Sequence, residues 1–207
     1  QKGMQYVDLM EKNTNQMLQL VNQILDFRKI QNGKMRLHVS LIDFNEMIAS
    51  FQKEFRVLSE ENEISFTFQL PDEPIMVWAD KEKMSIVIRN IISNAFKFTP
   101  QGGHVTLKAY PESSDGREMA VIQVEDDGIG IPAEEQTHIF ERFHQASSHK
   151  GNTGSGIGLN VAKEYVQMHH GKIDVLSSSG KGSCFTVCIP IGNINHVPSP
   201  LLPAAPQ

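Results

Sequence analysis

The order of strand-like and helix-like patterns along the chain constrains its fold more than any other feature. Alternating or short apolar segments predict strands over residues 35–42, 64–68, 76–79, 104–110, 119–125, 172–177 and 183–189. Helical patterns cover residues 43–59, 81–96 and 156–169. Several strands follow one another through turns alone, which excludes the regular strand–helix alternation of a dinucleotide-binding fold. The pattern predicts an α+β fold in which helices are layered on one face of a sheet.

Capping and turn residues indicate where these elements begin and end. Asp43, followed three positions later by Glu46, is a capping-box-like start for the first of these helices. Asp80 can cap the next helix in the same way. The hydrophilic segment 111–118, which contains an Asp-Gly pair, is predicted to be the turn between two strands.

A long amphipathic helix is predicted over residues 4–32. Its apolar positions repeat with a period of about 3.5 residues, and they include Val7, Met10, Met17, Leu18, Val21, Ile24 and Leu25. Asn32 and Gly33 are a stop signal for the helix. The stripe could pack on its own domain. However, it is long and nothing before it supplies a partner, which favours a bundle that is intermolecular or truncated.

These patterns divide the chain into three parts. Residues 1–34 are predicted to be part of a helical bundle, and residues 35–192 form the main domain. Residues 193–207 are rich in proline and are predicted to be a linker.

Composition and charge narrow the class of partner. The formal net charge is −5, and no basic stripe is present, which argues against nucleic acid as the main partner. No apolar run approaches the ~20 residues that span a bilayer, and no signal peptide opens the chain. We therefore expect a soluble, cytoplasmic protein without membrane contact. Cys184 and Cys188 are predicted to be two buried small hydrophobic side chains rather than a zinc site, and the eight histidines have no metal-ligand spacing.

The segment from Asp126 to Gly130, Asp-Asp-Gly-Ile-Gly, directly follows the apolar stretch 120–124. A carboxylate at a strand end can accept a hydrogen bond from the amino group of adenine, whereas guanine presents an acceptor there. A charge-assisted bond of this kind contributes roughly 1.5–3 kcal/mol. Gly128 and Gly130 allow the backbone to turn sharply and approach a base. The simpler alternative is an Asp-Gly turn without a ligand.

Asn90 and Asn94 lie four residues apart, on one face of the helix predicted over 81–96, and Lys97 lies one step further round. Amide oxygens together with the phosphates of ATP are adequate ligands for Mg²⁺. Asn94 is the predicted metal ligand. Asn90 could assist it or position a water, which makes it a possible catalytic residue, and Lys97 could neutralise phosphate charge. The alternative is a helix with two solvent-facing amides, although asparagine is a poor helix former.

Three glycines, Gly154, Gly156 and Gly158, precede the helix predicted to end near residue 169. Free backbone amides and the positive end of the helix could hold phosphates. The segment is not a Walker A motif, because no Gly-Lys-Ser/Thr follows, and Leu159 excludes the G-x-G-x-x-G pattern. A hinge is an equally good interpretation of this segment taken alone.

In this order, the motifs resemble the C-terminal kinase core of two-component sensor histidine kinases. The resemblance covers residues 5–191 and rests on five segments. They are 90–97, similar to the N box; 126–130, the first glycine box; 139–143, the F box; 154–159, the second glycine box; and 180–185, a third.

The resemblance implies a two-layer α/β sandwich of the GHKL, or Bergerat, ATP-binding type, with a mobile ATP lid at about residues 144–155. It implies Mg-ATP as cofactor, with adenine recognition by Asp126, magnesium at Asn94 and phosphate contact by Lys97 and the second glycine segment. Thr186 is expected to support Asp126 through a water.

The resemblance also implies partners. Residues 5–32, with the ending Phe27-Arg-Lys-Ile30 and then Gly33, resemble the second helix of the dimerisation and phosphotransfer domain. A homodimer through this helix and a response-regulator receiver domain are therefore expected partners. The phosphoacceptor histidine of the family lies on the preceding helix, and no histidine of this chain has its sequence context. We expect a fragment of a longer kinase, in the cytoplasmic part of a membrane-anchored receptor, and the proline-rich end suits a hybrid kinase.

Two other interpretations stay open. ATPases of the gyrase, mismatch-repair and heat-shock chaperone kind resemble this fold but carry a glutamate base where this chain has Asn90. An asparagine cannot act as a general base, which argues against efficient hydrolysis. The other interpretation is a degenerate nucleotide-binding or dimerisation module, against which the retained ATP contacts argue.

Overall fold

The computed structural model describes residues 32–114, 116–144 and 156–192, together with single positions before them. Those positions are Met10, Thr14, Met17, Leu18, Val21, Leu25 and residues 28–30, and all of them are helical. Five apolar side chains among them are exposed, from 47% at Val21 to 69% at Met17, whereas Ile30 is half-buried against the core of the domain. The predicted N-terminal helix is thus present at every described position, and the described part of its apolar stripe before residue 28 is uncovered. The predicted linker 193–207 lies outside the described residues.

Seven strands and four helices make up the rest of the described chain. The strands are β1 (Ser40–Asp43), β2 (Ser65–Gln69), β3 (Met76–Ala79), β4 (His104–Ser114), β5 (Arg117–Asp126), β6 (Lys172–Ser177) and β7 (Ser183–Pro190). The helices are α2 (Phe44–Glu61), α3 (Lys81–Phe98), α4 (Ala133–Gln136) and α5 (Gly158–Met168).

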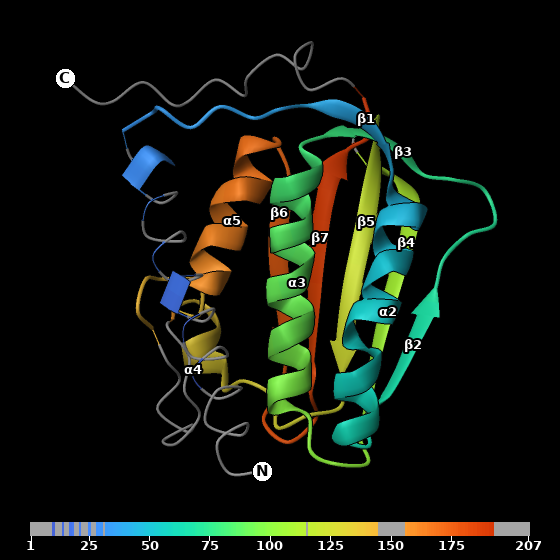
Figure 1. The fold of residues 1–207 in the computed structure, drawn as a ribbon, viewed down its shortest axis with the longest axis vertical. Coiled ribbons are helices and arrows are strands. Elements are labelled where there is room, and N and C mark those ends of the chain that lie inside the picture. The colour runs from blue at the N-terminus through green and yellow to red at the C-terminus, as the bar shows by residue number, and fades with distance from the viewer. Residues whose placement is uncertain are drawn as a thin grey trace.

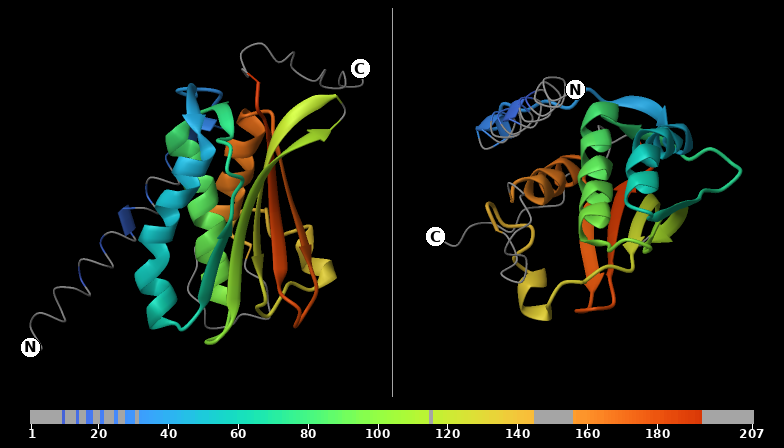
Figure 2. Two further views of the ribbon diagram at one scale, coloured as in Figure 1. Left: turned by 90° about the vertical axis from the view of Figure 1, so that its right-hand side faces the viewer. Right: turned by 60° about the horizontal axis from the view of Figure 1, so that its bottom comes forward.

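Five of the strands form one sheet in the order β2-β4-β5-β7-β6, and β1 pairs with β3 as a separate antiparallel ribbon. Helices α2, α3 and α5 cover one face of the sheet (Figures 1 and 2), so the predicted two-layer α+β sandwich is confirmed. From Ser183 to Ile189, alternate residues of β7 are buried, namely Ser183, Phe185, Val187 and Ile189, because alternate side chains of a strand point to opposite faces. Cys184 and Cys188 lie on the other face and are half-buried, so the prediction that both are buried is wrong. Within the described part of the chain, no helix is both long and apolar enough to cross a bilayer.

Two carboxylates begin the two long helices, as predicted. The carboxylate of Asp43 accepts hydrogen bonds from the amides of Asn45 and Glu46, at 2.8 and 3.2 Å. The carboxylate of Asp80 accepts one from the amide of Lys83, at 3.1 Å. Each bond satisfies an amide that has no partner within its own helix.

Two predicted boundaries are wrong. The strand predicted over residues 35–42 begins only at Ser40, because its partner β3 has four residues and the pairing starts at Ser40 opposite Ala79. The turn predicted over residues 111–118 is much shorter, because β4 continues to Ser114 and β5 begins at Arg117. This end of the hairpin is exposed at Glu112 and Glu118, so backbone pairing extends it without the apolar alternation that marks a buried strand.

Candidate functional site

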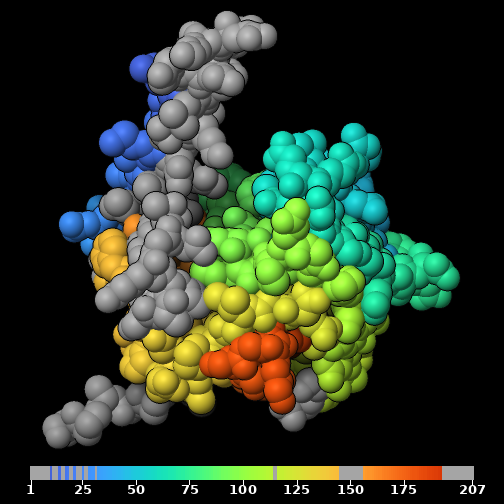
Figure 3. Space-filling view, turned by 90° about the horizontal axis from the view of Figure 1, so that it is seen from below, coloured from blue at the N-terminus to red at the C-terminus, as the bar shows by residue number. Residues whose placement is uncertain are grey.

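Three segments far apart in the sequence meet at the end of the sheet where β5 stops. They are the end of α3, the loop after β5 and the turn between β6 and β7. The amide of Ile129 donates to the carbonyl of Phe98 at 3.2 Å, and the amide of Gly180 donates to the carbonyl of Ile129 at 2.7 Å. Figure 3 looks onto this end of the molecule, where the yellow segment after β5 lies beside the orange-red β6–β7 turn. The hydrogen bonds fix the loop between the two other segments.

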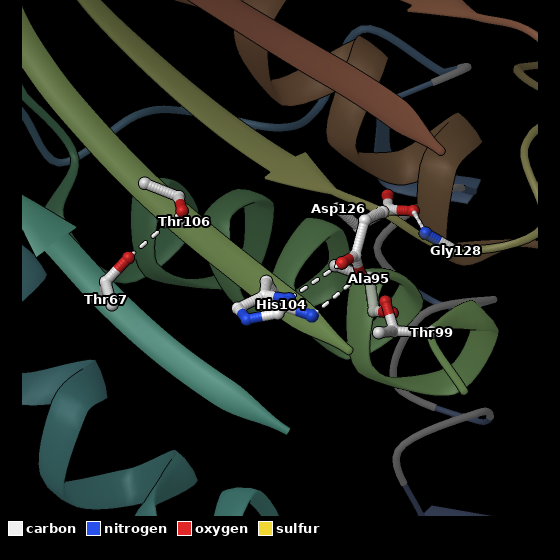
Figure 4. A network of polar contacts seen from close by, with 8 residues as sticks. Thr67, Ala95, Thr99, His104, Thr106, Asp126 and Gly128 are labelled. Atoms are coloured by element: carbon white, nitrogen blue, oxygen red, sulfur yellow. Dashed lines mark hydrogen bonds and ion pairs between the residues drawn. The ribbon is translucent and has the colours of Figure 1, made fainter. Parts of the chain in front are cut away.

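Asp126, the last residue of β5, is buried within this junction. Only 7% of the residue is exposed, and its Oδ1 accepts a hydrogen bond from the amide of Gly128 at 3.0 Å (Figure 4). Burial raises the pKa of Asp126 to about 6, although hydrogen bonding with the backbone of Gly128 and Ser183 acts to lower it. A buried carboxyl group with such a pKa is costly to the empty protein, and it is a typical property of a binding site.

The two glycines of the loop make room for its close packing. A Cβ at Gly128 would collide with the carbonyl oxygen of Phe98, and a Cβ at Gly130 would collide with the carbonyl oxygen of Ser178. Gly130 also has a positive φ of 66°, which favours glycine. Both positions thus need glycine for a backbone approach, as the sequence predicts, although the approach is to the protein's own backbone.

Asp127 attaches the start of this loop to the start of β4. Its two carboxylate oxygens contact His104, one at the backbone amide (2.7 Å) and the other at ring Nδ1 (2.8 Å). The amide of Asp127 donates in return to the carbonyl of His104 at 3.2 Å. Partial burial acts to raise the pKa of Asp127, but the hydrogen bonds from His104 outweigh it and lower the pKa overall. Figure 4 shows His104 next to the segment that leads from Asp126 to Gly128.

The polar face predicted on α3 lies against the start of α5. These two helices run side by side in opposite directions (Figure 1), which brings Asn90 to Gly158. The side-chain Nδ2 of Asn90 donates to the carbonyl of Gly158 at 3.2 Å, and a Cβ on Gly158 would lie 3.1 Å from Oδ1 of Asn90. Asn94 and Lys97 are half-buried further along the same helix. Burial lowers the pKa of Lys97, whose Nζ lies 4.9 Å from the ring centre of Phe98.

The predicted lid and second glycine segment are only partly described. Of the lid, the structure describes His144 alone; residues 145–155, which include Gly154, lie outside the described residues, and the second glycine segment is described from Gly156 onward. The carbonyl of Gly156 accepts from the amide of Phe143 at 2.9 Å. Asn160, which the sequence analysis missed, donates from Nδ2 to the carbonyl of Phe140 at 3.0 Å and is 8% exposed. The two bonds hold together the chain on either side of the predicted lid. The signal in the sequence was an asparagine beside the apolar residues Val161 and Ala162, near the start of the predicted helix.

The expected role of Thr186 is wrong. Thr186 pairs with Gln123, whose Nε2 donates to its hydroxyl at 3.4 Å, and it lies between the buried Phe185 and Val187. Its side chain therefore lies on the sheet face turned away from the helices. The residue opposite Asp126 is Ser183, 8% exposed, which directly follows the glycines of the third glycine segment. A strand register counted from Gly182 would have identified it.

The chain is similar to known proteins along most of its length. The family described as histidine kinase-, DNA gyrase B-, and HSP90-like ATPase matches residues 79–193. The circadian input-output histidine kinase CikA of Thermosynechococcus vestitus is 35% identical over 193 residues, which cover 91% of this chain and 26% of CikA. Full-length ShkA in complex with AMPPNP matches with a TM-score of 0.77 at 24% identity, covering 92% of this chain and 39% of that one.

A further solved structure, histidine kinase ThkA in complex with response regulator protein TrrA, has a TM-score of 0.67 at 22% identity. The match covers 87% of this chain and 49% of the matched chain. At these identities the two structures establish the fold. The chain spans about a quarter of the length of CikA, and less than half of either structural match.

Proposed function

The chain belongs to the family of histidine kinase-, DNA gyrase B- and HSP90-like ATPases, and from this membership we propose that it is the ATP-binding catalytic part of a sensor histidine kinase. The whole protein would transfer the γ-phosphoryl group of ATP to a histidine nitrogen, for relay to an aspartate of a response regulator. The observation that carries the proposal is the buried carboxyl group of Asp126 at the end of β5.

Asp126 fits the recognition of adenine. Its Oδ1 already accepts one hydrogen bond, from the amide of Gly128, and a carboxylate has further acceptor positions for an exocyclic amino group. Burial makes an added hydrogen bond stronger than it would be in water. A ligand that donates to this carboxylate would compensate for the desolvation that raises the pKa of Asp126 to about 6. The ligand amino group and the carboxylate are thus complementary.

The polar face of α3 fits Mg²⁺ and phosphate. Asn94 would supply an amide oxygen to the metal, and Asn90, fixed by its bond to Gly158, would hold a water or phosphate oxygen beside it. Bound Mg²⁺ would neutralise phosphate charge during transfer. Lys97 would add a positive charge at the same end of the helix, where partial burial lowers its pKa.

Asn90 favours a kinase over an ATP hydrolase. A hydrolase of this family needs a base at this position to activate water, whereas the Asn90 amide cannot accept a proton at neutral pH. Its Nδ2 instead donates to the carbonyl of Gly158. Positioning and electrostatics would then carry phosphoryl transfer to an acceptor that the rest of the protein brings to the site.

Partners follow from the same proposal. We propose that the exposed apolar positions of the N-terminal helix, Met10, Met17, Leu18, Val21 and Leu25, pair with a second copy in a homodimeric bundle. A response-regulator receiver domain would be the other partner, since ThkA is found in complex with such a protein. We place this part of the protein in the cytoplasm, where ATP and response regulators are available.

Calorimetric titration tests the proposal. Mg-ATP should bind saturably to this chain, and binding should weaken without magnesium and in Asn94→Ala. Asp126→Asn should lose affinity for ATP while keeping a folded structure. The second measurement compares transfer of γ-phosphoryl to an added phosphoacceptor helix pair with phosphate release in its absence. Transfer without rapid release supports a kinase, rapid release supports an ATPase, and no binding by the unmutated chain supports a degenerate module.

A further inference from the structure

A buried cluster lies at the end of α3 opposite to the candidate site. Its centre is Asp80, which is 3% exposed and precedes α3. One carboxylate oxygen accepts from the amide of Lys83 and caps the helix, at 3.1 Å. The other accepts from the amide of His38 at 2.8 Å. A single side chain therefore begins a helix and also binds a segment 42 residues away in sequence.

His169 holds the backbone of Asp80 from the other side. It follows the last residue of α5, is 0% exposed, and its Nε2 accepts from the amide of Asp80 at 3.0 Å. Because Nε2 accepts, the ring proton lies on Nδ1, which donates to the carbonyl of Tyr165 at 2.7 Å. Burial lowers the pKa of His169, and the nearby His170 lowers it further. The hydrogen bond to Tyr165 and the charge of Asp80 act to raise the pKa but do not outweigh burial. The imidazole is thus held in the neutral form that this geometry requires.

His38 belongs to the connecting segment 34–39, which has no regular secondary structure and joins the N-terminal helix to β1. At the other end of this segment, the amides of Lys34 and Met35 donate to the carbonyl of Lys29 in the helix, at 2.9 and 3.1 Å. Met35 also packs against the core of the domain. The connecting segment is therefore tied to the helix at one end and to Asp80 at the other.

We propose that Asp80 and His169 are positioning residues that anchor the connecting segment, and so hold the catalytic domain in a defined place relative to the N-terminal helix and to the phosphoacceptor carried by its bundle. This inference rests on the proposed function. The anchor acts on delivery of the nucleotide site to the acceptor and not on nucleotide binding, since Asp80 precedes the first turn of α3, whereas Asn90 and Asn94 lie in the second half of that helix.

A pair of matched variants separates anchoring from helix capping. Serine caps a helix about as well as aspartate, but its single oxygen cannot also reach the amide of His38. Asp80→Ser thus keeps the cap and removes the anchor. Asp43→Ser is the control, because Asp43 caps α2 through Asn45 and Glu46 and has no hydrogen bond to the connecting segment among the described residues.

The first readout is amide hydrogen exchange in this chain. The His38 amide should exchange at least about tenfold faster in Asp80→Ser, since it loses a charged acceptor, and should be unchanged in Asp43→Ser. This measurement needs no nucleotide, so it remains informative even if the chain does not bind ATP. Unchanged exchange at His38 in Asp80→Ser overturns the anchor.

The second readout is histidine phosphorylation by the full-length protein at saturating Mg-ATP. Asp80→Ser should slow transfer about tenfold with an unchanged Kd for Mg-ATP, as expected for loss of positioning alone. A normal rate of transfer overturns the positioning role. So does a loss of affinity for Mg-ATP as large as the loss of transfer rate. An unmutated protein that binds no ATP shows instead that the proposed function has failed, and the positioning role with it.

Variants of His169 give an independent measurement of the same role. His169→Gln supplies a side-chain oxygen that can accept from the Asp80 amide, whereas His169→Leu fills similar space without an acceptor. His38 protection and transfer should be better retained in His169→Gln than in His169→Leu at matched stability. Equal behaviour of the two variants shows that His169 only fills space, and overturns its part in the anchor.

Discussion

The carboxyl group of Asp126 accepts a hydrogen bond from the amide of Gly128, two residues ahead of it, at 3.0 Å in a site where the residue is 7% exposed. The loop after β5 thus turns back on the strand end and fixes one oxygen of the acid. Burial raises the pKa of this group to about 6, because the carboxylate is desolvated in the folded domain. The charged form at pH 7 therefore lowers the stability of the domain when no ligand donates to it. Stability and ligand binding make opposite demands on this residue.

Asp126→Asn should weaken ATP binding and stabilise the empty protein. Loss of a charge-assisted bond lowers affinity by roughly tenfold to a hundredfold. Removal of the buried charge raises the free energy of unfolding at pH 7 by up to about 3 kcal/mol, because a pKa shift of about two units is involved. Calorimetry and urea unfolding measure the two effects. Asp72→Asn is the exposed control and should change neither, and a destabilised Asp126→Asn would contradict the cost of burial.

Acid should weaken nucleotide binding through the protonation of Asp126. The carboxylate form accepts the hydrogen bond from adenine, so the affinity for ATP should fall by about tenfold per pH unit as the pH drops below the pKa of about 6. Stability moves the other way: because the folded pKa is raised above 3.8, this group favours the folded state most at low pH, and its contribution is lost as pH rises through 6. Kd and unfolding free energy measured from pH 5 to 8 test both signs. Asp126→Asn should remove this dependence.

Asp127→Asn should move that pH dependence without abolishing binding. The charge of Asp127 acts to raise the pKa of Asp126, so its removal lowers the pH at which affinity is lost. Stability should change by less than about 1 kcal/mol, because the contact of Asp127 with His104 is half-exposed and screened by solvent. A midpoint that stays in place, measured by the same titrations, would show that Asp127 does not act on Asp126 through its charge.

Gly158→Ala should reduce affinity for Mg-ATP without loss of stability. The new Cβ would lie 3.1 Å from Oδ1 of Asn90, so the amide must shift. Gly158 is the first residue of α5, where alanine gains less than the ~0.5–1 kcal/mol that it gains over glycine in a helix interior. A Kd raised several-fold with an unchanged or higher midpoint of thermal unfolding is the expected result. Gly192→Ala, with nothing within 4 Å, is the control. Unchanged affinity in Gly158→Ala would argue against a role of Asn90 in binding.

Gly130→Ala should destabilise the domain more than Gly180→Ala. Both glycines have positive φ, 66° and 75°, so both substitutions carry a backbone cost of about 1–2 kcal/mol. Only at Gly130 does the Cβ also meet a carbonyl, that of Ser178, whereas Gly180 has nothing within 4 Å. In urea unfolding, the free energy of unfolding of Gly130→Ala should lie about 1 kcal/mol below that of Gly180→Ala. Equal losses would show that the loop moves aside at little cost.

Local chemistry made much of the fold predictable. Asp43 and Asp80 were correctly predicted as helix caps, because a cap depends on residues within one turn. The four residues of β3 were also correctly predicted, since an apolar strand between turn signals needs no distant information. The hairpin between β4 and β5 was predicted with strands that are too short, because its exposed end is held by backbone pairing such as that of Glu112 with Met119, which the apolar pattern does not record.

The sequence by itself indicated which residues are candidates for the site. Asp126, Asn90, Asn94 and the glycines after β5 are predicted from residue type and spacing, which need no coordinates. Only the tertiary structure decided which groups meet. It set Ser183 and not Thr186 opposite Asp126, because strand register fixes which side chains share a face. It joined His38, Asp80 and His169, since hydrogen bonds between segments 42 and 89 residues apart follow from packing and leave no periodic trace in the sequence.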